Sequence, residues 1–310
     1  MKVSIIGSGN VGVATALYLI EKKVANVVLI DVVKGWAEGK ALDIVHASPI
    51  RKYDVYIDGY SDISKIEDSN VIVVTAGKPR LPGMSREDLL RDNVKIMKFV
   101  SENIAKYAPN AVVITVTNPL DVLAYVALKV TGFALKKVIG MAGILDSSRF
   151  RYFIAEELGV SPKNVTALVL GGHGDLMVPL PRYSTVHGIP VTDLLPKEKI
   201  DKLIERTRKA GGEIVAYLKT GSAYWSPGSS AAEMVECIVR NRNRIVPCSA
   251  YLRGEYGIDG LFAGVPIVIG ENGVEKIIEL SLTTEEKQAL HLSADKVREV
   301  IEKIEFEQLI

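Results

Sequence analysis

Cysteine is the scarcest informative residue in this chain of 310 residues. Only Cys237 and Cys248 occur, eleven positions apart, and neither belongs to a CxxC pair or a Cys/His cluster. The sequence therefore offers no metal-ligand pattern, and we expect no metal site. A disulfide between the two is one reading, but we expect two buried thiols in a reducing cytoplasm, because disulfides belong mainly to oxidising compartments.

Net charge and uninterrupted apolar runs are also small. The formal net charge is +1, so no broad field would gather a nucleic acid or an anionic membrane, and we expect neither as a partner. The mostly apolar stretch 3–20 could imitate a signal peptide, but it contains Gly7, Gly9, Asn10 and Gly12. Because no run of 18 residues lacks such polar breaks, we expect no membrane span.

Strand-like and helix-like patterns alternate through the first half of the chain. Short apolar runs rich in β-branched residues lie at 3–6, 27–30, 55–57, 71–75, 112–115 and 138–139. Amphipathic helical patterns lie between them, near 10–22, 36–46, 87–107 and 120–130. This alternation is typical of right-handed crossovers in a doubly wound parallel sheet, the Rossmann type of α/β fold.

The regular alternation ends after about residue 145. A helical pattern at 147–158 is followed by a strand-like run at 164–170, the Gly/Pro-dense stretch 171–190, and helical patterns at 197–219 and 228–240. Strand-like runs follow near 245–252, 265–269 and 274–280, and Thr283 with Glu286 forms a capping box for a last helix. The length exceeds the usual limit for one core, so we expect a parallel-sheet domain at 1–143 and an α+β substrate domain at 144–310.

A glycine pattern indicates dinucleotide binding by the first domain. Gly7, Gly9 and Gly12 form GxGxxG between the first strand and the first helix, which allows a tight turn, close approach of a pyrophosphate and close packing of helix on strand. Asp31 ends the next strand, nineteen residues past Gly12, where a carboxylate accepts hydrogen bonds from ribose hydroxyls. The same carboxylate would repel a 2′-phosphate, which favours NAD over NADP, although Lys34 lies near enough to weaken that preference.

Three further residues indicate proton transfer and carboxylate binding. His173 lies between two glycines, and imidazole gives and takes a proton near neutral pH. Asp146 and Arg149 lie three residues apart at the start of a helix and therefore on one face. The aspartate could hold the imidazole and the guanidinium could grip a carboxylate through two hydrogen bonds, although a plain surface ion pair would have the same spacing.

Two loops that follow strands complete the candidate set. The segment 75–86 contains Arg80 and Arg86 among glycines and prolines, which suggests a lid over an anionic substrate. Asn118 follows another strand before Pro119, and its amide could bridge a nicotinamide ribose and the substrate. Both loops belong to the edge of the sheet where open α/β folds bind ligands.

These motifs together resemble those of the lactate/malate dehydrogenase family, in its lactate-dehydrogenase-like branch. They are, in chain order, GSGNVG from residue 7, Asp31, AGKPRLPGMSR from 76, VTNPLDV from 116, GILDSSRF from 143 and GGHGDLMVPL from 171. The resemblance runs over nearly the whole chain. It implies a reversible, NAD-dependent hydride transfer between malate and oxaloacetate.

The resemblance also implies a role for each candidate. His173 would donate and accept the proton and Asp146 would be its partner, while Arg149 would bind the 1-carboxylate. Arg86 would polarise the carbonyl, Asn118 would orient cofactor and substrate, and Arg80 would read the second carboxylate. The other cofactor contacts that the resemblance implies are Gly7, Gly9, Asn10, Val11, Gly12, Asp31, Thr75, Ala76, Gly77, Asn93 and Val116.

Several alternatives stay open at this point. Lactate, or a broad set of 2-hydroxy acids, is the first, and Arg80 argues against it because the family's lactate enzymes typically carry glutamine there. NAD-dependent glycosidases share the fold but need a metal site, and a non-catalytic NAD-binding protein would not need this set of residues. The resemblance further implies a homo-oligomer, a tetramer rather than a dimer.

Overall fold

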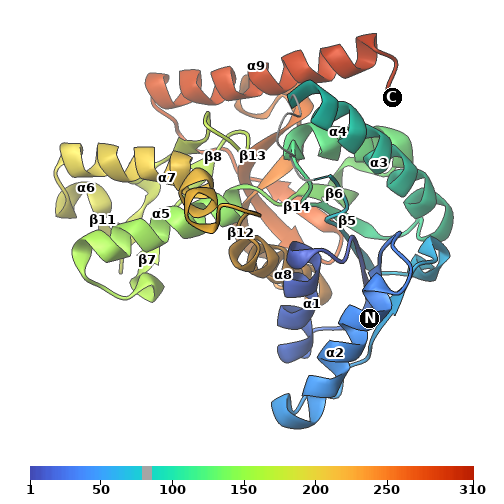
Figure 1. Ribbon diagram of the computed structural model, residues 1–310. Helices are drawn as coiled ribbons and strands as arrows, with labels where there is room; N and C mark the ends of the chain where they lie inside the picture. Colours follow the sequence, from blue (N-terminus) through green and yellow to red (C-terminus); the bar gives the residue numbers. More distant parts are fainter. Residues whose placement is uncertain (79–85) are drawn as a thin grey trace.

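A nine-stranded sheet forms the centre of the molecule (Figure 1). The computed structural model describes residues 1–78 and 86–310, with Arg86 described by its backbone alone. Six strands are parallel in the order β3-β2-β1-β4-β5-β6, the arrangement of a doubly wound dinucleotide-binding fold. Their bounds are β1 Lys2–Ile6, β2 Asn26–Ile30, β3 Ile57–Tyr60, β4 Val71–Val74, β5 Val112–Thr115 and β6 Val138–Gly140. The predicted α/β fold class is confirmed.

Helices from the first half of the chain cover this parallel sheet. They are α1 Asn10–Glu21, α2 Trp36–Arg51, α3 Arg86–Tyr107 and α4 Leu120–Thr131. The central strands are buried on both faces, which explains why they read as continuous apolar runs. The third strand was predicted at 55–57, but β3 runs over Ile57–Tyr60, because its pairing with β2 begins only at Ile57.

The second half of the chain extends the same sheet, which the division into two domains did not predict. Strands β12 Arg244–Arg253, β13 Asp259–Gly270 and β14 Gly273–Ile277 are antiparallel, and β12 pairs with the edge of β6 through Ser249 and Gly140. One large hydrophobic core therefore includes residues from both halves. A smaller core lies under α5 Gly143–Leu158 and α7 Lys197–Leu218. Figure 1 shows these two helices on the left, on the opposite side of the molecule from α3.

Short elements complete the second half. The remaining helices are α6 Val191–Leu194, α8 Trp225–Val239 and α9 Thr284–Phe306, and the small strands are β7 Val165–Thr166, β8 Val169–Leu170, β9 Val178–Pro179, β10 Thr185–Val186 and β11 Ile189–Pro190. Figure 1 shows the long α9 across one end of the molecule. The capping box predicted for it is confirmed, because the Thr283 hydroxyl accepts the N–H of Glu286 and the Glu286 carboxylate accepts the N–H of Thr283.

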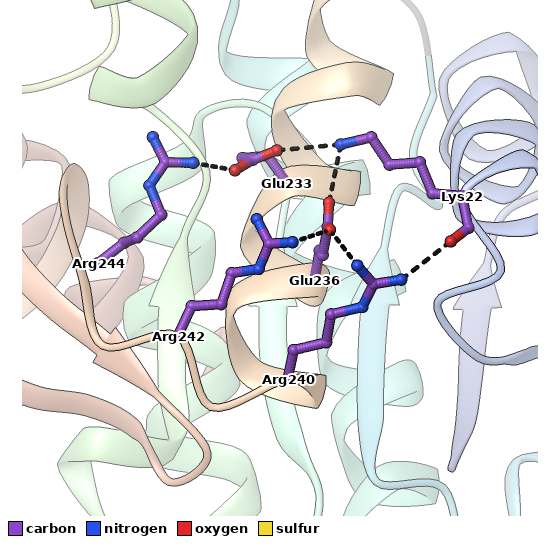
Figure 2. Close-up of polar contacts among 6 residues, drawn as sticks. All are labelled: Lys22, Glu233, Glu236, Arg240, Arg242 and Arg244. Atoms are coloured by element: carbon purple, nitrogen blue, oxygen red, sulfur yellow. Dashed lines mark hydrogen bonds and ion pairs between the residues drawn. The ribbon is translucent and has the colours of Figure 1, made fainter.

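Helices α1 and α8 join the two halves of the chain. Glu236 of α8 is buried, and its carboxylate accepts hydrogen bonds from Lys22 at 2.7 Å, Arg240 at 2.9 Å and Arg242 at 2.6 Å. Arg240 also donates to the carbonyl of Lys22, immediately after α1. Figure 2 shows this cluster, which is completed by Glu233 and Arg244. The end of α1 is thus tied to α8 by charged groups.

Two further predictions concern the cysteines and the absence of a membrane span. Cys237 and Cys248 are both free and buried, as predicted, and burial raises the pKa of Cys237 to about 11. Within the residues that the structure describes, no helix combines the length and apolar character needed to cross a bilayer.

Candidate active site

The glycine turn lies between β1 and α1 at the carboxyl edge of the sheet. Gly7 has φ +102°, a left-handed conformation that favours glycine, and a Cβ there would lie 2.5 Å from the nitrogen of Ala76. A Cβ on Gly12 would lie 2.0 Å from the carbonyl oxygen of Gly7. These two glycines are required by the fold itself, because either side chain would collide with backbone.

Gly9 differs from the other two, since a Cβ on it would meet no atom within 4 Å. Gly9 precedes the first turn of α1, whose free N–H groups and positive dipole end attract phosphate. The open space at Gly9 therefore fits a pyrophosphate approaching the backbone. A side chain there would fill the space in front of the helix end.

Asp31 follows β2 and is held beside the glycine turn. One of its oxygens accepts hydrogen bonds from the N–H of Ser8 at 2.9 Å and from the Ser8 hydroxyl at 3.0 Å. The other accepts the N–H of Val33 at 3.1 Å. Each carboxylate oxygen has more than one lone-pair site, so the side chain is fixed in place and can still accept from a ribose hydroxyl. The turn and the carboxylate together fit an adenine dinucleotide.

His173 and Asp146 meet as the sequence predicted. Nδ1 of His173, in the loop after β8, lies 2.8 Å from an oxygen of Asp146, in the first turn of α5. Asp146 is buried, with a side chain 3% exposed, while that of His173 is 19% exposed. Burial lowers the pKa of His173, but the charge and hydrogen bond of Asp146 outweigh it and leave the pKa raised above its usual value.

Arg149 lies beside this pair on the same helix. Its Nη1 is 3.3 Å from Asp146, and its side chain is only 12% exposed. Burial lowers the pKa of Arg149, and Asp146 opposes that effect. The buried Nε of Arg149 has no hydrogen-bond partner among the described residues. An unpaired buried donor on a guanidinium is suited to a carboxylate supplied by a substrate.

Asn93 ties together two of the loops at this edge. Its side chain accepts the N–H of Lys78 at 2.8 Å and donates to the carbonyl of Asn118 at 2.9 Å. Asn118 itself is exposed, so its side chain is free to meet a ligand. The loop after β4 and the loop after β5 are therefore fixed to each other through Asn93.

The structure brings most of the predicted site residues to one edge of the sheet. Thr75 donates its hydroxyl to the carbonyl of Gly7 at 2.7 Å, and Ala76 touches the same turn. Two predicted substrate residues are not tested, because Arg80 and the side chain of Arg86 lie outside the described residues. The roles of all these residues stay predictions.

The sequence reasoning missed two buried residues behind His173. Asp121, in the first turn of α4, accepts the N–H of His173 at 3.1 Å, and Ser249 of β12 donates to the same carboxylate at 2.6 Å. Asp121 lies within VTNPLDV, in the first turn of a helix. An acidic residue at such a position commonly stabilises the helix through its dipole, so it gives no distinct sign of a functional role. Its contact with a loop 52 residues away has no local signal.

Comparison with known proteins places this geometry in a family. The family model described as lactate/malate dehydrogenase, NAD binding domain matches residues 1–140, and the model described as lactate/malate dehydrogenase, alpha/beta C-terminal domain matches residues 144–308. The chain is 52% identical to a malate dehydrogenase of Chlorobium limicola over 300 residues, which are 96% of this chain and 97% of that protein.

Solved structures of relatives superpose closely on the chain. A malate dehydrogenase from Picrophilus torridus in its apo form has a TM-score of 0.95 and 48% identity, covering 98% of this chain and 97% of that one. A lactate dehydrogenase from Cryptosporidium parvum, solved with lactic acid and nicotinamide adenine dinucleotide, has a TM-score of 0.95 and 41% identity, covering 98% of both chains. The chain therefore belongs to the lactate/malate dehydrogenase family, and its N-terminal part is an NAD-binding domain.

Proposed function

We propose that this chain is an NAD-dependent malate dehydrogenase, an oxidoreductase that interconverts malate and oxaloacetate. The observation that carries the proposal is the 2.8 Å contact of His173 with the buried Asp146, beside a guanidinium with an unpaired buried donor. High identity to malate dehydrogenases over nearly the full chain supports the same reaction. We further infer that residues 1–143 form the dinucleotide-binding domain and residues 144–310 the catalytic and substrate domain, with Arg80, Arg86 and Asn118 reaching the substrate from the first.

In the proposed reaction, separate residues transfer the proton and bind the substrate carboxylate. When bound, NADH supplies the hydride that reduces the keto carbon. Protonated His173 gives its proton to the keto oxygen, and Asp146 holds the ring and stabilises its charged form. Arg149 binds the carboxylate next to that carbon through parallel hydrogen bonds, which fixes the carbonyl toward His173. In the oxidation of malate the same imidazole, now neutral, accepts the hydroxyl proton.

The loop after β4 supplies the rest of the proposed site. We assign Arg86 to the keto oxygen, where charge develops in the transition state, and Arg80 to the second carboxylate of oxaloacetate or malate. A second arginine for a second carboxylate favours a dicarboxylate over lactate, which has only one. Asn118 would orient both cofactor and substrate, and Asn10, Val11, Gly77 and Val116 would line the cofactor site.

Substitution of Arg80 tests the choice between malate and lactate. A buried carboxylate without its partner costs about 3–5 kcal/mol, or roughly two to three and a half orders of magnitude in binding. Arg80→Gln should therefore lower kcat/KM for oxaloacetate by at least about 100-fold and spare pyruvate. The measurement is NADH oxidation followed by absorbance, with both keto acids and with NADPH in parallel. An unchanged oxaloacetate-to-pyruvate ratio would remove Arg80 from this role.

Assembly and location complete the proposal. We infer a homo-oligomer, a tetramer rather than a dimer as the family resemblance implies, and the apolar side chains exposed on α2, α7 and α8 support association. Two unpaired buried thiols fit a reducing compartment, which supports the cytoplasm.

A further inference from the structure

Asp121 is a buried carboxylate that the reaction above does not use. The residue is 5% exposed, and its oxygens accept from the Ser249 hydroxyl at 2.6 Å and from the peptide N–H of His173 at 3.1 Å. Among the described residues, no lysine, arginine or histidine side chain forms an ion pair with it. Burying a carboxylate with no direct counter-ion costs free energy of folding. A residue kept in spite of that cost is a candidate for a part in function.

Three features favour the ionised form of Asp121. It lies in the first turn of α4, where the helix dipole attracts negative charge. Burial raises the pKa of Asp121 and leaves it above its usual value, although the hydrogen bonds from Ser249 and from the peptide of His173, together with the charge of His173, oppose that effect. The cation that can partly neutralise this carboxylate is therefore the protonated imidazole of His173.

The charges that face His173 come from two helices. Helix α5 contributes Asp146 and Arg149, and α4 contributes Asp121. From α9, Ser293 accepts the N–H of Gly172 at 2.8 Å, and this contact adds no charge. With His173 protonated, two positive and two negative charges balance among the described residues. Without Asp121 the site would hold one excess positive charge, which opposes protonation of the ring.

We propose that Asp121 is a positioning residue for the reaction, a buried carboxylate that ties the main chain of His173 to the start of α4 and shares with Asp146 the balancing of the protonated imidazole. The inference rests on the proposed function, because it assigns His173 the proton. It separates two tasks, since Asp146 fixes the ring while Asp121 fixes the backbone that carries it. The glycine at position 172 is consistent with this contact, because a Cβ there would lie 3.2 Å from an Asp121 oxygen.

Asp121→Asn removes the charge and keeps the shape. The amide oxygen can still accept from the peptide N–H of His173, and the amide nitrogen can donate to the Ser249 hydroxyl, which is able to accept. We expect the loss of kcat/KM for oxaloacetate reduction to grow by about threefold between pH 6 and pH 8.5, because one fewer negative charge weakens proton binding by the imidazole. A purely structural role would lower activity equally at every pH.

The second readout is the ring of His173, observed by NMR of protein labelled at histidine Cε1 without substrate. The chain has four histidines, and the His173 signal is the one lost in His173→Gln. Its titration midpoint should move to lower pH in Asp121→Asn. In the matched control, Ser249→Ala, the carboxylate is retained and loses only one hydrogen bond, so the midpoint should move less than in Asp121→Asn. If Asp121→Asn does not fold, as judged by thermal unfolding, Asp121→Ser takes its place.

The outcomes separate the two proposals. Equal midpoints in the wild type and in Asp121→Asn would overturn the role of Asp121, whatever the activity. A wild-type chain that reduces no keto acid would overturn the proposed function, while the NMR titration would still decide on Asp121. A pH-independent loss in both Asp121→Asn and Ser249→Ala would assign this contact to structure alone and also overturn the inference.

Discussion

At the scale of single residues, we expect the pair of His173 and Asp146 to set the pH dependence of the proposed reaction. Asp146 raises the pKa of His173, so the ring keeps its proton above the usual range. Reduction needs the protonated ring and should fall as pH rises through the raised pKa, while oxidation should fall as pH drops below it. Asp146→Asn removes the charge that raises the pKa of His173, whereas burial and Arg149, which both lower that pKa, remain. The variant should therefore reduce kcat/KM for oxaloacetate at pH 7.5 by about 100-fold or more.

The control for this variant is Asp175→Asn, two residues from His173. Asp175 is exposed, and its charge is screened by solvent, so its loss should change reduction by less than about twofold. Steady-state rates in both directions across pH 5.5–9 make the comparison. The assignment of Asp146 fails if its variant keeps the pH profile of the wild type. The same linkage acts on stability, because a raised histidine pKa stabilises the fold below the usual pKa and ceases to do so as pH rises through the raised value.

Residues with a chemical signature could be predicted from the sequence, and residues defined by packing could not. His173, Asp146 and Arg149 lie in motifs whose side chains suit proton transfer and carboxylate binding, and the structure brings them together. Asn93 was predicted as a cofactor contact, but both of its described hydrogen bonds join main-chain groups of neighbouring loops. Long-range contacts of this kind depend on tertiary structure, which short motifs do not encode.

At the scale of elements, the predicted helices and strands differ from the structure chiefly at their ends. Helix α2 continues to Arg51 through Pro49, beyond the predicted end at residue 46, although proline usually interrupts a helix. The edge strand β3 alternates buried and half-buried residues, which is a weaker signal than a continuous apolar run. Central strands such as β4, which are apolar on both faces, were predicted within one residue.

The junction of α1 and α8 gives a prediction for one element pair. Burial raises the pKa of Glu236, but Lys22 and the arginines around it more than offset this and lower the pKa. Glu236→Gln removes the negative charge that these cations surround and leaves only an amide oxygen as acceptor. The cation side chains are 38–50% exposed and therefore screened, so we expect a loss below the ~3–5 kcal/mol of a fully buried pair, about 2 kcal/mol in the free energy of unfolding.

Urea denaturation at a fixed protein concentration measures this loss. The matched control is Glu299→Gln, which removes an exposed pair with Lys296 and should cost less than about 0.5 kcal/mol. A lowered carboxyl pKa stabilises the fold above the unfolded value, so the difference between wild type and Glu236→Gln should shrink as pH falls through the lowered pKa. Equal losses in the two variants would show that the cluster in Figure 2 contributes no more than a surface pair.

At the scale of the whole molecule, the continuity of the sheet could not be predicted. Each strand pattern indicated a strand, but nothing local indicated that β12 pairs with β6 rather than with a sheet of its own. Strand order depends on which strand edges are available for pairing, and that is a property of the assembled chain. The two halves therefore share one core even though the family models divide them near residue 140.

Exposed apolar side chains at the same scale lead to the last prediction. Ile50 at the end of α2 is 82% exposed, and Tyr217 near the end of α7 is 81% exposed, values that leave large apolar groups in water. Scattered exposed apolar residues are common, but α2 and the α7–α8 region each expose several, which is typical of subunit interfaces. We expect light scattering at micromolar concentration to give a mass about four times the 33.7 kDa of one chain.

Tyr217→Glu should lower that mass by placing a charge in an interface, whereas Glu299→Gln should not. A wild-type mass of one chain would contradict the inferred assembly, and an unaltered mass for Tyr217→Glu would exclude that face from it.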